Sequence, residues 1–175
     1  AVNKERLVVT VGGVDWERTR RKGYEVFVKS AAHLPDVKFV LVGKWYDSSI
    51  DYLRKIAPGN VTFTGSVSQE ELVKLLGRAK VYVQASFHEA FGCSLAEAML
   101  CECIPVVSRN GAIPEVVGDT GIYLDELTPQ ELAKKIEIAL KLPDEYGKRA
   151  RKRIIECFPL IKRKNAILEL IQGMN

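Results

Sequence analysis

The chain has 175 residues, of which 47% are hydrophobic and 27% are charged, so it has the length of one domain and can bury a core. Its net charge of +4 is mild, and no apolar run reaches the roughly 18 residues that a membrane span needs, so we expect no transmembrane helix. The opening residues carry no cleavage region, so we expect no signal peptide and a chain that begins directly on its first strand.

Apolar runs of strand length alternate with longer segments of helical spacing. The predicted strands are Leu7–Gly13, Val37–Gly43, Val61–Gly65, Val81–Ser86, Cys103–Ser108 and Gly121–Leu124. The predicted helices are Lys22–Leu34, Ser48–Ala57, Ser68–Ala79, Gly92–Leu100 and Thr128–Leu142. Ser68 with Glu71 three residues later predicts a capping box. Thr128 followed by Pro129 predicts a helix start.

This repeated order of strand and helix predicts an α/β fold, a Rossmann-like parallel sheet of about six strands flanked by helices in a single domain, residues 1–175. Ligands bind at the carboxyl ends of the strands in such folds, near the point where the strand order reverses. The loops to watch are those after Gly13, Gly43, Gly65, Ser86 and Ser108. The last forty residues read as helical and basic, with breaks at Pro143 and Pro159.

The cysteines and the basic tail indicate the compartment and the partners of the protein, and they do not indicate a catalytic site. Cys101 and Cys103 flank one residue, but no second pair and no nearby histidine completes a metal site. We therefore expect free thiols in a reducing compartment and a cytoplasmic protein. From Lys141 onward the chain is basic, which predicts either a solvated helix face or a surface near anionic lipid or an acidic partner domain.

The segment "FGCS" reads as the start of a helix. A helix N-terminus exposes unpaired backbone N–H groups and a partial positive charge, Gly92 lets a ligand approach the backbone, and Ser94 adds a hydroxyl. The segment could therefore hold a phosphate. An ordinary capped helix is the alternative.

Two glutamates flank this segment with seven residues between them. Glu97 lies on an otherwise apolar helix that should pack on the sheet, so its carboxylate needs a partner, and the hydroxyls of a ribose would serve. Glu89 precedes the helix and could reach the far side of a bound phosphate. A nucleoside on one side and a hexose on the other would fit. The alternative is that Glu97 pairs with a nearby cation and Glu89 is solvated.

A basic segment, Asp15–Glu25, follows the first strand and reads as a loop. Its cations would face a diphosphate on the Gly92 helix: Arg18, Arg20, Arg21 and Lys22. A solvated basic loop is the alternative, and without aromatic interleaving or a known module we expect no nucleic-acid partner. After the fifth strand, Gly111 and Pro114 predict a tight structural turn in which Glu115 caps or pairs locally.

These segments together resemble a known family. "HEAFGCSLAEAM", "CIPVVS" and "NGAIPEVVGDTGIYL" are similar to the donor-binding, C-terminal half of retaining glycosyltransferases of the GT-B fold, and more narrowly to glycosyltransferase family 4. The earlier "KGYEVFVKSAAHLPDVKFVLVG" and "VTFTGSVSQEELVKLLGRAKVYVQAS" follow the order of the same family. The resemblance covers nearly the whole chain.

The resemblance implies a nucleoside diphosphate sugar as donor substrate, bound between two Rossmann-like domains and used without a metal or other cofactor. It implies that Glu97 holds the ribose, that Glu89 lies beside the donor hexose and that Lys22 neutralises the leaving diphosphate. It implies backbone contacts to the diphosphate and sugar from Phe91, Gly92, Cys93, Ser94 and Leu95. The base is expected near Ser66 and Val67.

Two departures from the family pattern stand out. Many members carry an arginine directly after the glycine that ends the first strand, where this chain has Gly13. The resemblance leaves open whether Arg18, Arg20 or Arg21 replaces that arginine. "CEC" stands where Cys-Gly-x is more usual, and the sequence gives Glu102 no role.

The resemblance also implies an acceptor domain that this chain does not supply. We therefore expect the C-terminal half of a longer hexosyltransferase, specific for mannose or glucose on GDP or UDP, whose terminal helix, about residues 158–173, packs on that domain. A lipid-linked or polysaccharide acceptor would fit the basic tail, with association to a membrane surface. The isolated domain should transfer little. The alternatives are a degenerate nucleotide-sugar-binding or regulatory module, and a GT-B epimerase or phosphorylase.

Overall fold

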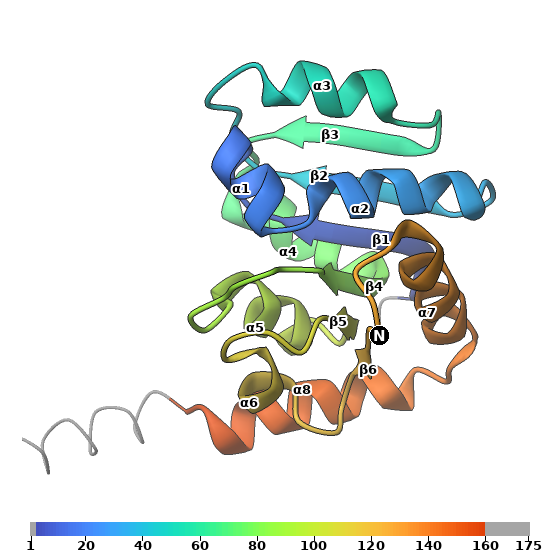
Figure 1. Ribbon diagram of the computed structural model, residues 1–175. Coiled ribbons are helices and arrows are strands. Elements are labelled where there is room, and N and C mark those ends of the chain that lie inside the picture. Colours follow the sequence, from blue (N-terminus) through green and yellow to red (C-terminus); the bar gives the residue numbers. More distant parts are fainter. Residues whose placement is uncertain (1–2, 160–175) are drawn as a thin grey trace, which may run out of the picture.

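The computed structural model of the chain describes residues 3–159. A sheet of six parallel strands runs through its middle in the order β3-β2-β1-β4-β5-β6. The strands are β1 (Glu5–Val11), β2 (Lys38–Val42), β3 (Val61–Gly65), β4 (Ala79–Gln84), β5 (Ile104–Val107) and β6 (Ile122–Tyr123). Figure 1 shows them stacked from β3 at the top to β6 at the bottom. The predicted fold class is confirmed.

The helices cover both faces of this sheet. They are α1 (Trp16–Arg21), α2 (Tyr24–Ser30), the 3₁₀ turn η1 (Ala31–His33), α3 (Ser49–Ile56), α4 (Gln69–Arg78), α5 (Cys93–Leu100), α6 (Ile113–Val117), α7 (Pro129–Lys141) and α8 (Glu145–Cys157). The predicted capping box of Ser68 and Glu71 is present, and Thr128 caps α7 with Pro129 in its first turn.

Alternation along the strands divides the core in two. Val81 and Val83 of β4 pack with α2, α3 and α7, whereas Tyr82 between them packs with α4, α5, α6 and α8. Successive side chains of a strand point to opposite faces, so each strand is buried on both sides. This explains why the central strands read as continuous apolar runs.

Three local predictions from the sequence differ from the structure. The segment predicted as a basic loop, Asp15–Glu25, contains the short helix α1, because the Asp15 side chain accepts the Arg18 N–H at 2.7 Å and caps it. The predicted helix Lys22–Leu34 accordingly begins only at Tyr24, because Gly23, with φ +67°, interrupts the helical backbone between α1 and α2. The predicted turn around Pro114 likewise contains a helix, α6, with Pro114 in its first turn.

The end of the described chain agrees with the expected helical, basic tail. Between Pro143 and Pro159 the basic tail forms α8, which packs on α5 and ends at Cys157. Most of the terminal helix expected at residues 158–173 lies outside the described residues. All four cysteines are described, and none forms a disulfide.

Candidate functional site

The strand order reverses between β1 and β4, which are neighbours at the centre of the sheet. The segments that follow these two strands therefore emerge side by side at the carboxyl edge of the sheet. This is the position where open α/β sheets bind ligands. Every catalytic or diphosphate-binding residue predicted from the sequence belongs to one of these two segments or to the first turn of α5.

Close backbone contact joins the two segments. Gly23, which follows α1, faces the segment after β4, and a Cβ on Gly23 would lie 2.3 Å from the carbonyl oxygen of Ala85. The N–H of Phe87 donates to the carbonyl of Arg21 at 2.7 Å. Only a glycine fits at position 23, and Lys22 is thereby brought beside the segment that carries Glu89.

A third segment holds Glu89 from the other side. The N–H of Ala112, at the start of α6, donates to the Glu89 carbonyl at 3.0 Å. A Cβ on Gly111, whose φ is +60°, would lie only 2.1 Å from that carbonyl oxygen. Gly111 is thus needed for a close backbone approach as well as for the tight turn that the sequence predicts.

Lys22 and Glu89 form the central ion pair of this edge. The Lys22 Nζ donates to Glu89 Oε2 at 3.3 Å, and both side chains are only 13% exposed. The Gln84 amide nitrogen also donates to Glu89 Oε2, at 2.9 Å. The structure therefore brings together the two side chains predicted to be catalytic, although they lie 67 positions apart in the chain.

The first turn of α5 lies directly beyond this pair. Gly92 caps the helix with φ +82°, and its carbonyl accepts the first intrahelical bond, from Ala96 at 3.0 Å. The first N–H groups of a helix have no partner within it and carry a partial positive charge. Cys93 is exposed there, and Ser94 is half-buried. The backbone of this turn can bind an anion.

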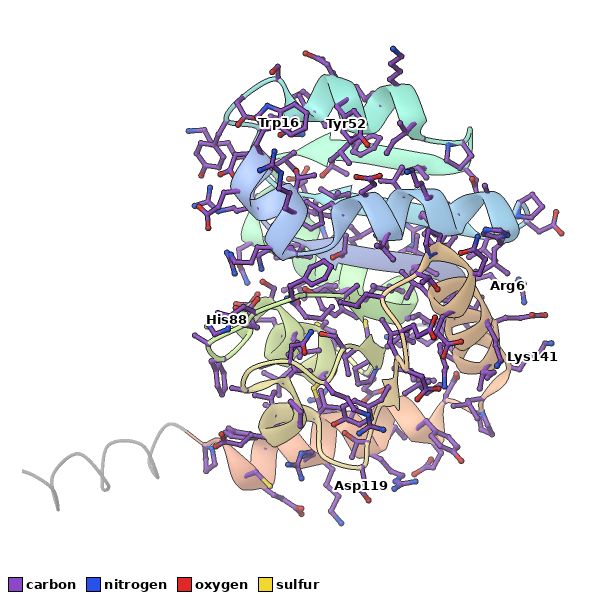
Figure 2. All side chains as sticks on the ribbon, viewed as in Figure 1. Arg6, Trp16, Tyr52, His88, Asp119 and Lys141 are labelled. Carbon is purple, nitrogen blue, oxygen red and sulfur yellow. The ribbon has the colours of Figure 1, made fainter. Side chains whose placement is uncertain are left out.

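The arginines of the first segment point in different directions. Arg18 pairs with Asp15 and lies 5.1 Å from the centre of the Tyr46 ring. Arg21 donates to the carbonyl of His88 at 3.3 Å, and Figure 2 places His88 on the segment after β4. Arg20 has no ion-pair partner within the described residues. Within the described residues, Arg21 is the one of the three whose side chain hydrogen-bonds to the segment that carries Glu89.

Glu97 does not need the buried partner that we expected. Its side chain is exposed and, across residues 3–159, it makes no ion pair, so water can solvate it. It lines a cavity of about 190 Å³ with Gln69 and Leu72, which belong to α4. Ser66 and Val67 lie immediately before α4, with Ser66 exposed and Val67 partly buried. Glu97 thus faces α4 across this groove, whereas Ser66 and Val67 precede α4 and do not line it.

Phe91 has a contact that the sequence did not predict. Its ring packs edge-on against Phe158, with the ring centres 5.5 Å apart. Leu95 is fully buried in the core below. These two side chains therefore fix the position of the predicted diphosphate segment by packing.

An aromatic groove of about 550 Å³ lies next to the site, and sequence reasoning missed it. Trp16, Tyr52 and Phe87 line it together with Arg20. Figure 2 shows Trp16 and Tyr52 close together, and their ring centres are 5.5 Å apart. The groove joins side chains from α1, α3 and the segment after β4, so no single stretch of sequence reveals it.

Gln84 and Tyr82 were also missed. Both are buried at the end of β4, and the Tyr82 hydroxyl donates to Gln84 Oε1 at 3.2 Å. A signal was present: in "VYVQAS" polar atoms recur at every second residue, which puts Tyr82, Gln84 and Ser86 on one face of the strand. A buried ladder of polar groups on a central strand usually has a partner at its end.

The described part of the chain holds neither a cluster of metal ligands nor a membrane-spanning helix. No group of three His, Cys, Asp or Glu side chains among residues 3–159 is arranged to hold a metal ion. No helix in the same range is long and apolar enough to cross a bilayer.

Comparison with known proteins gives consistent matches. Residues 2–157 match the family model described as "Glycosyl transferases group 1". The chain is 32% identical to α-maltose-1-phosphate synthase of Mycolicibacterium smegmatis, over 87% of the chain and 44% of that protein. It is 39% identical, over 46% of its length and 22% of the relative, to O-antigen chain mannosyltransferase B of Escherichia coli.

Solved structures have the same fold. A sucrose-phosphate synthase from Thermosynechococcus elongatus superposes with a TM-score of 0.82 at 25% identity, over 96% of this chain and 45% of that one. HepE from Anabaena, solved with UDP and glucose, gives a TM-score of 0.83 at 22% identity, over 98% and 49%. The chain thus spans about half the length of these structures.

Proposed function

Because the chain belongs to the group 1 glycosyl transferases, we propose that it binds the donor, a nucleoside diphosphate hexose, in a retaining hexosyl transfer. The chain spans less than half of several matched proteins, so the acceptor domain belongs to the proposal as a partner. One observation carries the proposal: the largely buried pair of Lys22 and Glu89 lies directly before the N-terminus of α5.

This arrangement suits the departure of a nucleoside diphosphate. Negative charge develops on the phosphate as its bond to the sugar breaks. The first-turn amides of α5 and the Lys22 ammonium would stabilise that charge, and they are already in place before the reaction. Removing one such preorganised donor costs about 3–4 kcal/mol in comparable sites.

The remaining parts of the donor have matching positions. We place the hexose beside Glu89, whose Oε2 is held by Lys22 and Gln84. Two hydroxyls of the ribose would bind the exposed carboxylate of Glu97, and the base would lie toward Ser66 and Val67 across the groove shared by α4 and α5. Arg21 is the arginine best placed to contact the diphosphate, since, within the described residues, it is the one of the three whose side chain hydrogen-bonds to the segment that carries Glu89.

The names of relatives suggest the hexose and the acceptor. One similar protein, from Mycobacterium tuberculosis, is named a GDP-mannose-dependent phosphatidylinositol dimannoside mannosyltransferase, and one similar structure contains UDP and glucose. We propose mannose or glucose on GDP or UDP, and a lipid-linked or polysaccharide acceptor. Stronger co-sedimentation with anionic than with neutral vesicles would support a lipid surface; equal binding would count against it.

Calorimetric titration with GDP, UDP, ADP and their hexose conjugates tests the donor site. We expect one nucleoside diphosphate to bind, and Glu97→Ala to weaken it at least tenfold by removing the acceptor for two ribose hydroxyls. Unfolding stability should change by no more than about 0.5 kcal/mol, because the side chain is exposed and has no ion pair in the described structure.

Exposed Glu70 provides the matched control. It lies on α4 and, among residues 3–159, pairs only with Lys74, so Glu70→Ala should leave nucleotide affinity unchanged. Equal affinity of the Glu97→Ala variant and the unaltered chain would refute the ribose assignment. No nucleotide binding at millimolar concentration, either alone or joined to an acceptor domain, would favour a degenerate module.

A further inference from the structure

Glu89 is the end of a hydrogen-bonded series that starts at Tyr82 in β4. The Tyr82 hydroxyl donates to Gln84 Oε1 at 3.2 Å. The Gln84 amide nitrogen then donates to Glu89 Oε2 at 2.9 Å. Lys22 completes the series from the other side.

The direction of each hydrogen bond is fixed by its neighbours. Burial raises the pKa of the Tyr82 hydroxyl, so it stays protonated and available as a donor. Because Tyr82 donates to the oxygen of the Gln84 amide, the NH₂ group must face the other way. It faces two acceptors, Glu89 Oε2 and the Ser86 hydroxyl at 2.8 Å.

Burial makes this arrangement specific. Gln84 is 3% exposed and Tyr82 is fully buried, so neither side chain can exchange its partner for bulk water. A buried amide that lost its acceptor would carry the full desolvation penalty, which favours one orientation of the Glu89 carboxylate over others. Glu89 is itself on an irregular segment, where the backbone alone would not fix its side chain.

We propose that Gln84, oriented by Tyr82, is a positioning residue that holds the Glu89 carboxylate so that its second oxygen faces the donor hexose. This inference rests on the proposed function, and it adds the part of the site that distinguishes a sugar nucleotide from the bare nucleotide. Oε2 is occupied by Lys22 and Gln84, whereas no described residue donates a hydrogen bond to Oε1.

The test compares affinities for the nucleoside diphosphate hexose and for the corresponding nucleoside diphosphate, measured by calorimetry. Gln84→Leu keeps the approximate volume and removes the amide. We expect it to lower the ratio of the two association constants about tenfold, with affinity for the bare diphosphate within twofold. Tyr82→Phe, which removes only the orienting donor, should lower the ratio about threefold.

Ser86→Ala is the matched control. It removes the other acceptor of the same amide and leaves the bond to Glu89 in place, so the ratio should stay within twofold. A merely structural role of Gln84 would change both affinities or neither. An unchanged ratio in Gln84→Leu, with diphosphate binding intact, would overturn the inference.

A double-mutant cycle measures the coupling between Gln84 and Glu89 without any ligand. If the amide holds the carboxylate, then Gln84→Leu and Glu89→Leu together should lower the melting temperature by less than the sum of the separate changes. Additive shifts would overturn the inference even if nucleotide binds. Conversely, a non-additive cycle without any nucleotide binding would refute the proposed function and leave the contact between Gln84 and Glu89 standing.

Discussion

The two edges of the sheet use their charged groups differently. At the amino edge, Lys4 donates to the carbonyls of Leu76 and Cys101 at 3.2 and 2.6 Å, near the ends of α4 and α5. Arg78 and Glu5 form a two-pronged pair at the same edge. At the carboxyl edge, Arg20 and Glu97 have no ion-pair partner among the described residues.

The difference shows what each edge contributes. Polar groups at the amino edge satisfy carbonyls that helices leave unpaired, so they stabilise the fold. Exposed charges at the carboxyl edge contribute little to stability and are available to a ligand. Substitutions at the first edge should therefore change stability alone, and substitutions at the second should change binding.

Two glycines give the largest expected effects and the sharpest contrast. A Cβ on Gly111 would lie 2.1 Å from the Glu89 carbonyl oxygen, and a Cβ on Gly147, in α8, would lie 2.1 Å from that of Glu102. Each change to alanine should cost about 2–4 kcal/mol of unfolding free energy, since backbone must move. Denaturant titration measures this cost.

Nucleotide-hexose affinity then separates the two variants. Gly111→Ala should weaken it because Glu89 is displaced, whereas Gly147→Ala should leave the folded fraction fully competent. Gly59→Ala is the control, since its Cβ would meet nothing within 4 Å. Equal affinity of Gly111→Ala and Gly147→Ala for the nucleotide hexose would contradict the proposed difference between the two edges of the sheet.

Lys4→Met should have the next largest effect. The substitution keeps the apolar length of the side chain but removes both hydrogen bonds to the helix-end carbonyls, a loss of about 1.5–3 kcal/mol for bonds to a charged group. Exposed Lys55, at the end of α3, is the control and should tolerate methionine within about 0.5 kcal/mol. Chemical denaturation measures both, and a change in nucleotide affinity of Lys4→Met would contradict the assignment.

Glu102→Gly should give the smallest effect, with the opposite sign. Glu102 is the one described non-glycine residue with positive φ, at +62°. It follows α5 in a Schellman motif, where Cys103 N–H bonds Ala98 O and Glu102 N–H bonds Met99 O. Glycine should relieve the left-handed strain and stabilise the chain by about 0.5–1 kcal/mol, less the weak pair with Arg151 at 3.6 Å.

Thermal unfolding measures the stabilisation expected for Glu102→Gly directly. Glu102→Ala serves as its control, since it loses the same ion pair and keeps the strain, so it should be no more stable than the unaltered chain. Stabilisation by alanine equal to that by glycine would show that the strain explanation is wrong.

Much of the fold follows from local patterns. Buried parallel strands read as continuous apolar runs, and the capping box at Ser68 marks the start of α4, so six strands and most helices were predictable. The short helices α1 and α6 were not, because each depends on a cap or turn whose residues are equally common in loops. The strand order was not predicted, since neither propensity nor periodicity encodes which strands become neighbours.

The site residues also divide into those that local sequence predicts and those that depend on contacts between distant segments. Glu89, Lys22 and the start of α5 were identified from spacing and from the family resemblance. The expected burial of Glu97 was wrong, because a helix that packs on a sheet still exposes one side to water. Gln84 and the groove lined by Trp16 and Tyr52 depend on contacts between distant segments, which a single sequence does not show.

The central neighbours β1 and β4 come from distant parts of the chain. Glu5 in β1 pairs with Ala79 in β4, and β1, β2 and β3 are all synthesised before β4, the strand that closes the sheet against them. Lys22 meets Glu89 only after this late closure. A nucleotide held by both segments binds only closed molecules, and at a hundred times its dissociation constant it would add about 2.7 kcal/mol to their stability. A bound donor would then stabilise the contact between two parts of the chain that are synthesised at different times.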